Sequence, residues 1–198
     1  MRQHTDAKHL KIQVERFHKV AALLASKVTG EPFADMLSMN VDTFPCIVSD
    51  GSMLSCVLAR RPHRRDYDYI TPYVVNAAFS MELRFKLLKL LETNEWISGH
   101  ELIGLYNNQS DETKDYLDKE LSSIVENSQF HKKLHQRINN ELKIGFAWEM
   151  ENLLTESSKA FEDWRYLFQN KPGWFAGYKE ITLCLSKRIK NVEGISSL

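Results

Sequence analysis

Cysteine is scarce in this sequence, which has only Cys46, Cys56 and Cys184 among its 198 residues. The number is odd, the spacing is wide and no pair forms a C-x-x-C motif. Such a set is typical of a reducing intracellular compartment, where disulfides are rare. Residues 1–13 also lack the apolar run that follows the charges of a secretory signal. We therefore expect a cytoplasmic protein.

Net charge is absent as well, because 26 basic residues balance 26 acidic ones. No overall field then draws the protein to nucleic acid or to anionic lipid, so any such attraction must come from a local patch. The sequence has no G-x-S-x-G motif, no P-loop and no G-x-G-x-x-G motif. It therefore lacks the signatures of the common nucleophile and nucleotide-loop classes, and we expect no cofactor.

Two histidines, His131 and His135, lie one helical turn apart, as they do in zinc-binding helices. Two lysines stand between them, and the glutamate of a metalloprotease motif is missing. A pattern with only two ligands is weak, and an exposed helix face explains it better. We therefore predict no metal site.

The stretch from Ile70 to Gln109 is the one around which the chain is organised. Thr71 suits the N-cap of a helix, and Pro72 suits its first position. Apolar side chains then recur at three- and four-residue spacing, at Val74, Ala78, Met81, Phe85 and Leu88. A segment this apolar, but too short and too charged to cross a membrane, indicates the central helix of a bundle.

A second helix start is predicted shortly after this helix. Ser98 and Glu101 have the spacing of a capping box, which places His100 in the first turn of a short helix. Apolar periodicity and start and stop residues predict further helices. These cover residues 7–29, 111–126 with Ser110 as the N-cap, 129–155, 159–169 and 175–191, and residues 192–198 are expected to fray.

The least helical part, residues 31–69, contains Asp50-Gly51 between two apolar runs. This dipeptide favours a type I′ turn, because both central residues of that turn need positive φ. We therefore predict a small β-hairpin inserted between the first and second helices. No repeat or composition shift marks a second domain, so residues 1–198 are predicted to form one mainly α domain, an up-and-down helical bundle.

Three short blocks of the sequence belong together. They are Asn76-Ala-Ala-Phe-Ser-Met-Glu82-Leu83 with Lys86 after it, Gly99-His100-Glu101-Leu102, and Phe161-Glu-Asp-Trp164-Arg165-Tyr166. Together they resemble the HEPN superfamily of small helical domains. The resemblance implies a HEPN-like bundle that pairs as a homodimer, and a role in phage defence or in a toxin–antitoxin system.

Ribonucleases of that superfamily resemble one another in an Arg-x(4–6)-His motif, and this chain departs from the pattern. Only Arg2 and His9 have the spacing, at its loosest limit, and they lie at the start of the chain instead of in a late helix. The resemblance therefore implies the fold without the nuclease motif.

The densest positive charge lies in the segment just before the central helix. Candidate ligand residues there are Arg60, Arg61, Arg64, Arg65, Tyr67 and Tyr69. Arginine forks match phosphate, and tyrosine rings can stack on bases. The alternative is a solvated loop whose charge Asp66 and Asp68 partly offset. His100 is a further ligand candidate, because a helix N-terminus suits an anion.

Glu82 lies within the apolar central helix and is expected to be buried, so it needs a partner. Lys86 follows one turn later in the favourable order for an ion pair. The family blocks suggest Arg165 as the partner instead. We therefore predict a structural ion pair between Glu82 and Arg165 that locks the fold.

These observations lead to three hypotheses about function. The first is a non-catalytic module that binds RNA or a nucleotide. The second is a protein-protein interaction module that docks its partner through the hairpin and exposed aromatics such as Trp174 and Phe175. The third is an atypical metal-free ribonuclease. Phosphate binding predicts an affinity that falls steeply with salt, whereas protein docking does not.

Overall fold

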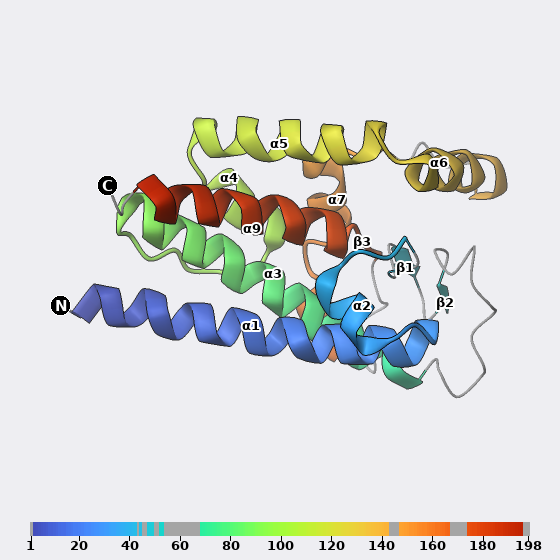
Figure 1. The fold of residues 1–198 in the computed structure, drawn as a ribbon, viewed down its shortest axis with the longest axis horizontal. Helices are drawn as coiled ribbons and strands as arrows, with labels where there is room; N and C mark the ends of the chain where they lie inside the picture. The colour runs from blue at the N-terminus through green and yellow to red at the C-terminus, as the bar shows by residue number, and fades with distance from the viewer. Residues whose placement is uncertain are drawn as a thin grey trace.

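Long helices form the body of the molecule (Figure 1). The computed structural model describes residues 2–42, 44, 47–49, 52–53, 68–142, 147–166 and 174–195. In it, α3 (Ile70–Thr93) packs between α1 (Arg2–Thr29) and α9 (Tyr178–Ile195), and α5 (Asp111–Glu126) packs on the far side of α9. The mainly α class expected from the sequence is confirmed.

The shorter helices pack against this body. α2 lies on α1, α8 lies on α3, α6 contacts α5, and α4 contacts both α3 and α7. Their bounds are α2 (Phe33–Ser38), α4 (Leu102–Asn107), α6 (Gln129–Leu142), α7 (Met150–Glu156) and α8 (Ala160–Arg165).

Helix boundaries differ from the sequence-based expectation in several places. The predicted helix over 129–155 is divided, because α6 ends at Leu142 and residues 147–149 are not helical. Trp148 in this break is buried against the His131 ring, at 4.7 Å between ring centroids, so packing holds the break in place. The predicted fraying is also wrong for residues 192–195, since α9 runs to Ile195 and buries Val192.

The central helix α3 is buried on most of its circumference, as its all-round apolar character predicts. It begins one residue before Thr71, and Tyr69 occupies the N-cap without a side-chain bond. Pro72 still lies within the first turn, where the backbone N–H groups have no intrahelical partner.

Within the described ranges, every helix is too short or too polar for a membrane span.

Three short strands lie beside the bundle, in the order β2-β1-β3. β1 (Ile47–Ser49) pairs antiparallel with β2 (Ser52–Met53), and Val48 is opposite Met53. Asp50 and Gly51, which the sequence places in a turn, lie outside the described residues. The sequence did not predict β3 (Phe175–Ala176), which pairs antiparallel with the other edge of β1.

This strand changes the role expected of two aromatic residues. Phe175 is fully buried and Trp174 is half-buried, so neither is the exposed docking aromatic that the sequence suggested. The Phe175 ring lies 6.1 Å from the Tyr73 ring of α3 and 6.3 Å from the Tyr178 ring of α9, between centroids. Phe44 joins the same aromatic cluster, 5.7 Å from Tyr178.

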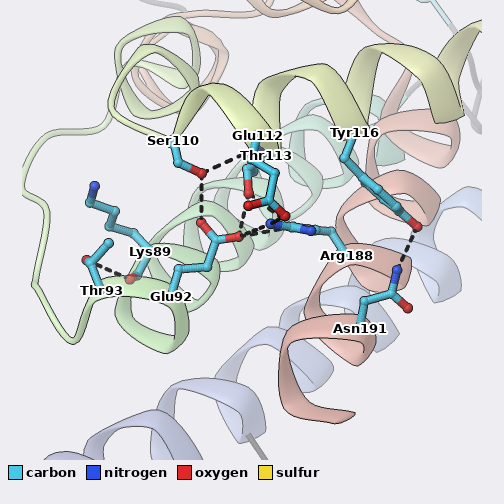
Figure 2. Close-up of polar contacts among 9 residues, drawn as sticks. All are labelled: Lys89, Glu92, Thr93, Ser110, Glu112, Thr113, Tyr116, Arg188 and Asn191. Carbon is cyan, nitrogen blue, oxygen red and sulfur yellow. Dashed lines mark hydrogen bonds and ion pairs between the residues drawn. The ribbon is translucent and has the colours of Figure 1, made fainter. Parts of the chain in front are cut away.

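A polar network ties three of the long helices together (Figure 2). Arg188 of α9 donates from Nε to Glu92 of α3 at 3.0 Å and to the Thr113 hydroxyl of α5 at 3.0 Å. Thr113 donates in turn to the same carboxylate, and Ser110 donates to it at 3.4 Å. Ser110 also accepts from the Thr113 N–H at 3.2 Å, which confirms it as the N-cap of α5.

Replacing Arg188 with alanine is expected to destabilise the fold by about 2–3 kcal/mol, because the Glu92 carboxylate would lose its cationic partner. That carboxylate is only 10% exposed, so water replaces the lost donors poorly. Urea unfolding measures the loss. Lys187→Ala, which removes an exposed pair with Glu120 from the next position, should cost less than about 1 kcal/mol. Equal losses in the two variants would contradict this role for Arg188.

A buried histidine connects α1 with α9 and with the end of α2. His18 Nε2 donates to the Leu37 carbonyl at 3.2 Å, and Nδ1 accepts from the Tyr178 hydroxyl at 2.9 Å. Burial, together with the nearby Arg84 guanidinium, lowers the pKa of His18 from 6.5 to about 4. The folded protein therefore holds His18 neutral.

Stability should fall as the pH decreases from about 6.5 to about 4. Over that range the unfolded chain binds a proton on His18 that the folded chain does not bind. This difference alone lowers the free energy of unfolding by up to about 3 kcal/mol. Urea unfolding at pH 7 and pH 4.5 measures the difference. His18→Gln should be less stable at pH 7 but should lose less on acidification, whereas the exposed His9→Gln should follow the parent. An unchanged pH response in His18→Gln would refute the assignment.

Candidate functional site

The structure describes only part of the predicted ligand-binding set. Residues 60–67, which include Arg60, Arg61, Arg64, Arg65 and Tyr67, lie outside the described residues. Tyr69 is 39% exposed at the start of α3. His100 contacts Glu82, which belongs to the same helix α3. At a rise of 1.5 Å per residue, Glu82 lies about 20 Å along the helix from Tyr69. Tyr69 and His100 therefore belong to separate surfaces.

Glu82 is buried, as the sequence predicts, but its partners differ from the predicted one. Lys86 Nζ lies 2.7 Å from Glu82 Oε1, and both side chains are less than a tenth exposed. The predicted partner, Arg165, instead places its guanidinium over the rings of Phe161 and Tyr166, at 5.7 and 5.2 Å from their centroids. Lys86 reaches the carboxylate from one turn away on the same helix, so the ion pair is local to α3.

His100 is the second partner of Glu82. Its Nδ1 lies 3.1 Å from both carboxylate oxygens. The carboxylate accepts, so Nδ1 carries the hydrogen and Nε2 is the acceptor of the neutral ring. The histidine side chain is 53% exposed, whereas the carboxylate that holds it is 2% exposed. The result is a solvent-facing imidazole with a fixed orientation and tautomer.

The segment that carries His100 does not form the capping box that the sequence predicted. α4 begins at Leu102 with Glu101 at the N-cap and no side-chain cap bond, and Ser98 and His100 lie in the non-helical segment before it. The Leu102 N–H donates to the Ser158 carbonyl at 3.1 Å, which fastens this segment to the turn before α8. His100 is therefore positioned by Glu82 and not by a helix N-terminus.

One aromatic ring joins His100 to the positive charge of Arg165. The Phe161 ring stacks on Phe79 of α3 at 5.1 Å and on His100 at 6.1 Å between centroids. Arg165 follows one helical turn later in α8 and packs on the same ring. We call the exposed His100 and Arg165, together with the half-buried Phe161 between them, the His100 surface. The sequence analysis named its two polar members as candidates, whereas Phe161 entered only as part of the block around Trp164 and was given no role.

The other histidine pair does not form the exposed helix face that the sequence suggested. His131 is 2% exposed, and its Nε2 lies 3.0 Å from Glu180 of α9. The half-buried His135 is bonded to Asn139. Among the residues that the structure describes, no three His, Cys, Asp or Glu side chains are grouped to hold a metal ion.

Cys184 carries no reactive thiol. It is fully buried in α9, and burial raises the pKa of its thiol to about 12. A thiol of this kind stays protonated near neutral pH and is a poor nucleophile. Cys46 and Cys56 lie outside the described residues.

Comparisons with protein-family models, with curated proteins and with solved structures give no match to this chain.

Substitution of Glu82 by glutamine is expected to cost about 2–3 kcal/mol of stability, because it leaves the buried Lys86 ammonium without an anionic partner. Urea unfolding measures the loss. The double variant Glu82→Leu with Lys86→Met should recover most of it, since the charged pair is then replaced by apolar groups of similar size. Glu162→Gln removes an exposed carboxylate from α8 and should change stability by less than about 0.5 kcal/mol. A glutamine variant as stable as the parent would show that the pair does not hold the fold.

Proposed function

We propose that this protein is a non-catalytic module that binds RNA or a nucleotide, and that the His100 surface contacts the phosphate. The observation that carries the proposal is the exposed imidazole of His100, held by the buried Glu82 and packed on the same ring as Arg165. Lys86 already neutralises the Glu82 carboxylate. A phosphate that approaches this surface would therefore meet a guanidinium and an imidazole, and no unpaired buried anion would repel it.

Phosphate recognition needs hydrogen-bond donors and positive charge at the surface. The Arg165 guanidinium supplies both, and its planar fork matches a phosphate in a bidentate way. The ring nitrogen Nε2 of His100 accepts from a ribose hydroxyl when neutral and donates to a phosphate oxygen when protonated. Tyr166, which is 38% exposed beneath the same guanidinium, offers an aromatic face to a base.

The resemblance of the sequence blocks supports the finer parts of the proposal. We assign a HEPN-like bundle with the 31–69 segment as a hairpin insertion, in a cytoplasmic homodimer that acts in phage defence or in a toxin–antitoxin system. Arg60, Arg61, Arg64, Arg65 and Tyr67 extend the phosphate-binding set in this proposal. The interaction-module alternative keeps its hairpin but loses the exposed aromatic pair that motivated it, because Phe175 is fully buried and Trp174 is half-buried.

Labelled single-stranded RNA, titrated with the protein across a salt series, tests the proposal. Affinity should fall steeply with salt, and Arg165→Ala should weaken binding and reduce the slope of log K against log salt by about 1. Lys119→Ala, which removes an exposed positive charge from α5, is the matched control and should leave the slope unchanged. Alanine at Arg60, Arg61, Arg64 and Arg65 together should produce a larger loss for the same reason. No binding at low salt would rule out the proposal and favour the interaction module.

A second candidate, a metal-free ribonuclease, is favoured by one feature of the same surface. An imidazole whose far nitrogen is held by a carboxylate is a suitable general base, and a guanidinium on the same ring could stabilise the charge on phosphorus. The two residues lie in different parts of the sequence, so the Arg-x(4–6)-His spacing does not reveal them. The same RNA incubations distinguish the candidates. Cleavage that His100→Ala abolishes would establish the ribonuclease, and intact RNA supports the binding module.

A further inference from the structure

Two of the long helices carry opposite charges. α1 contains six basic residues and two acidic ones, whereas α5 contains six acidic residues and two basic ones. α3 and α9 lie between these two helices, so the two sets of charges are on opposite edges of the molecule (Figure 1). The chain has no net charge, but its charge is strongly polarised across the bundle.

The positive charge of α1 is concentrated on its outer face. Arg16, Lys19 and Lys27 are exposed, and they lie within about 80° of arc at 100° per residue. The two acidic residues of the helix, Asp6 and Glu15, fall outside that arc. Within the described part of the chain, none of the three cations forms a hydrogen bond or an ion pair. These cations are therefore available to an external partner.

Exposed aliphatic side chains lie among these cations. Ile12 and Leu23 fall within the same arc and are 40% and 47% exposed. Such side chains offer no hydrogen bond to a phosphate, whereas they are stabilised when another protein surface covers them. The outer face of α1 therefore suits a protein surface that carries carboxylates better than it suits a nucleic acid.

The outer face of α5 carries carboxylates at a matching spacing. Asp115, Asp118 and Glu126 are exposed, and they are separated by three and eight residues, as the three cations of α1 are. The two basic residues of this helix, Lys114 and Lys119, fall outside the arc of the three carboxylates. The face is therefore the acidic counterpart of the outer face of α1.

The negative charge around Asp118 is not balanced within the chain. Burial raises the pKa of the Asp118 carboxyl, and the carboxylates of Asp115, Glu151 and Glu149 raise it further. A hydrogen bond from the Tyr106 hydroxyl acts in the opposite direction, but the net shift of the pKa is upward. Carboxylates that repel one another in this way are stabilised by a cation from outside.

We propose that the outer face of α1 docks onto the outer face of α5 of a second copy of this chain. When the two helices lie parallel, their equal spacing places one carboxylate opposite each of the three cations. The two faces are on opposite edges of the bundle, so one copy cannot offer both faces to the same partner. The contact is therefore heterologous and adds copies head to tail, because each pair keeps one free face at either end.

Sedimentation equilibrium of the full chain, without RNA, tests the proposal. At about 20 mM salt, where exposed charges are poorly screened, the weight-average mass should rise with concentration beyond twice the monomer mass of 23.1 kDa. It should fall at about 500 mM salt. Two variants reverse the charge of one face each, Arg16→Glu with Lys27→Glu on α1, and Asp115→Lys with Glu126→Lys on α5. Each variant alone should associate at least about 10-fold more weakly than the parent.

Mixing the two variants distinguishes a docked pair of faces from a general effect of charge. An equimolar mixture should associate again, because the acidic α1 of one variant meets the basic α5 of the other. A single chain with all four substitutions should also associate. Lys132→Glu with Lys133→Glu, two exposed residues of α6, changes the net charge as much as the α1 variant does and should still associate.

Several outcomes would overturn the proposal. They are a parent that stays monomeric at low salt, a mass that stops at twice that of the monomer, and a mixture that associates as weakly as its components. A monomeric parent that sediments with phosphatidylserine vesicles, and no longer does so with the α1 substitutions, would assign this face to anionic lipid instead. Unchanged melting temperatures show that the variants are folded. Because RNA is absent from these measurements, their failure leaves the proposed function untouched.

Discussion

The burial of charged side chains on the central helix constrains the rest of this structure. α3 packs against α1, α9 and α8, yet it carries Glu82, Lys86 and Glu92 along its length. A charge removed from water must be paired, or the folded state loses several kcal/mol, about 3–5 for a broken buried pair. The lysine at one turn's distance meets this need for Glu82, and Arg188 from α9 meets it for Glu92. The Glu82 pair is local to α3, whereas the Arg188 pair ties α9 to α3 and, through Thr113, α5 as well.

The candidate site follows from the same constraint. Glu82 is nearly inaccessible to water, but one edge of its carboxylate contacts His100 on the surface. A buried anion thereby orients an exposed imidazole, and the neighbouring Phe161 ring brings Arg165 to the same place. The proposed phosphate site and the stability of the bundle thus depend on one residue. Only a variant that replaces both Glu82 and Lys86 separates the two roles.

Particular elements show how far local sequence reasoning extends. The N-cap of α5 at Ser110 was predicted correctly, because capping is a contact between residues three positions apart. The capping box at Ser98 was wrong, because Gly99 adopts φ +98° and the segment is fastened to the turn before α8. The break between α6 and α7 was missed, since the apolar spacing continues across it. The strand β3 was missed as well, because its partner β1 lies far away in the sequence.

The sequence by itself determined the helical class, the presence and apolar character of the central helix and the need for a partner at Glu82, because periodicity and the cost of burying charge act within a few turns. It also named His100 and Arg165 as residues of interest. Only the tertiary structure decided that Lys86 and His100 share the carboxylate, that Phe161 connects the two polar groups, and that α1 and α5 lie on opposite edges of the bundle. Those outcomes depend on which surfaces of distant segments meet, and residue spacing along the chain carries no information about that.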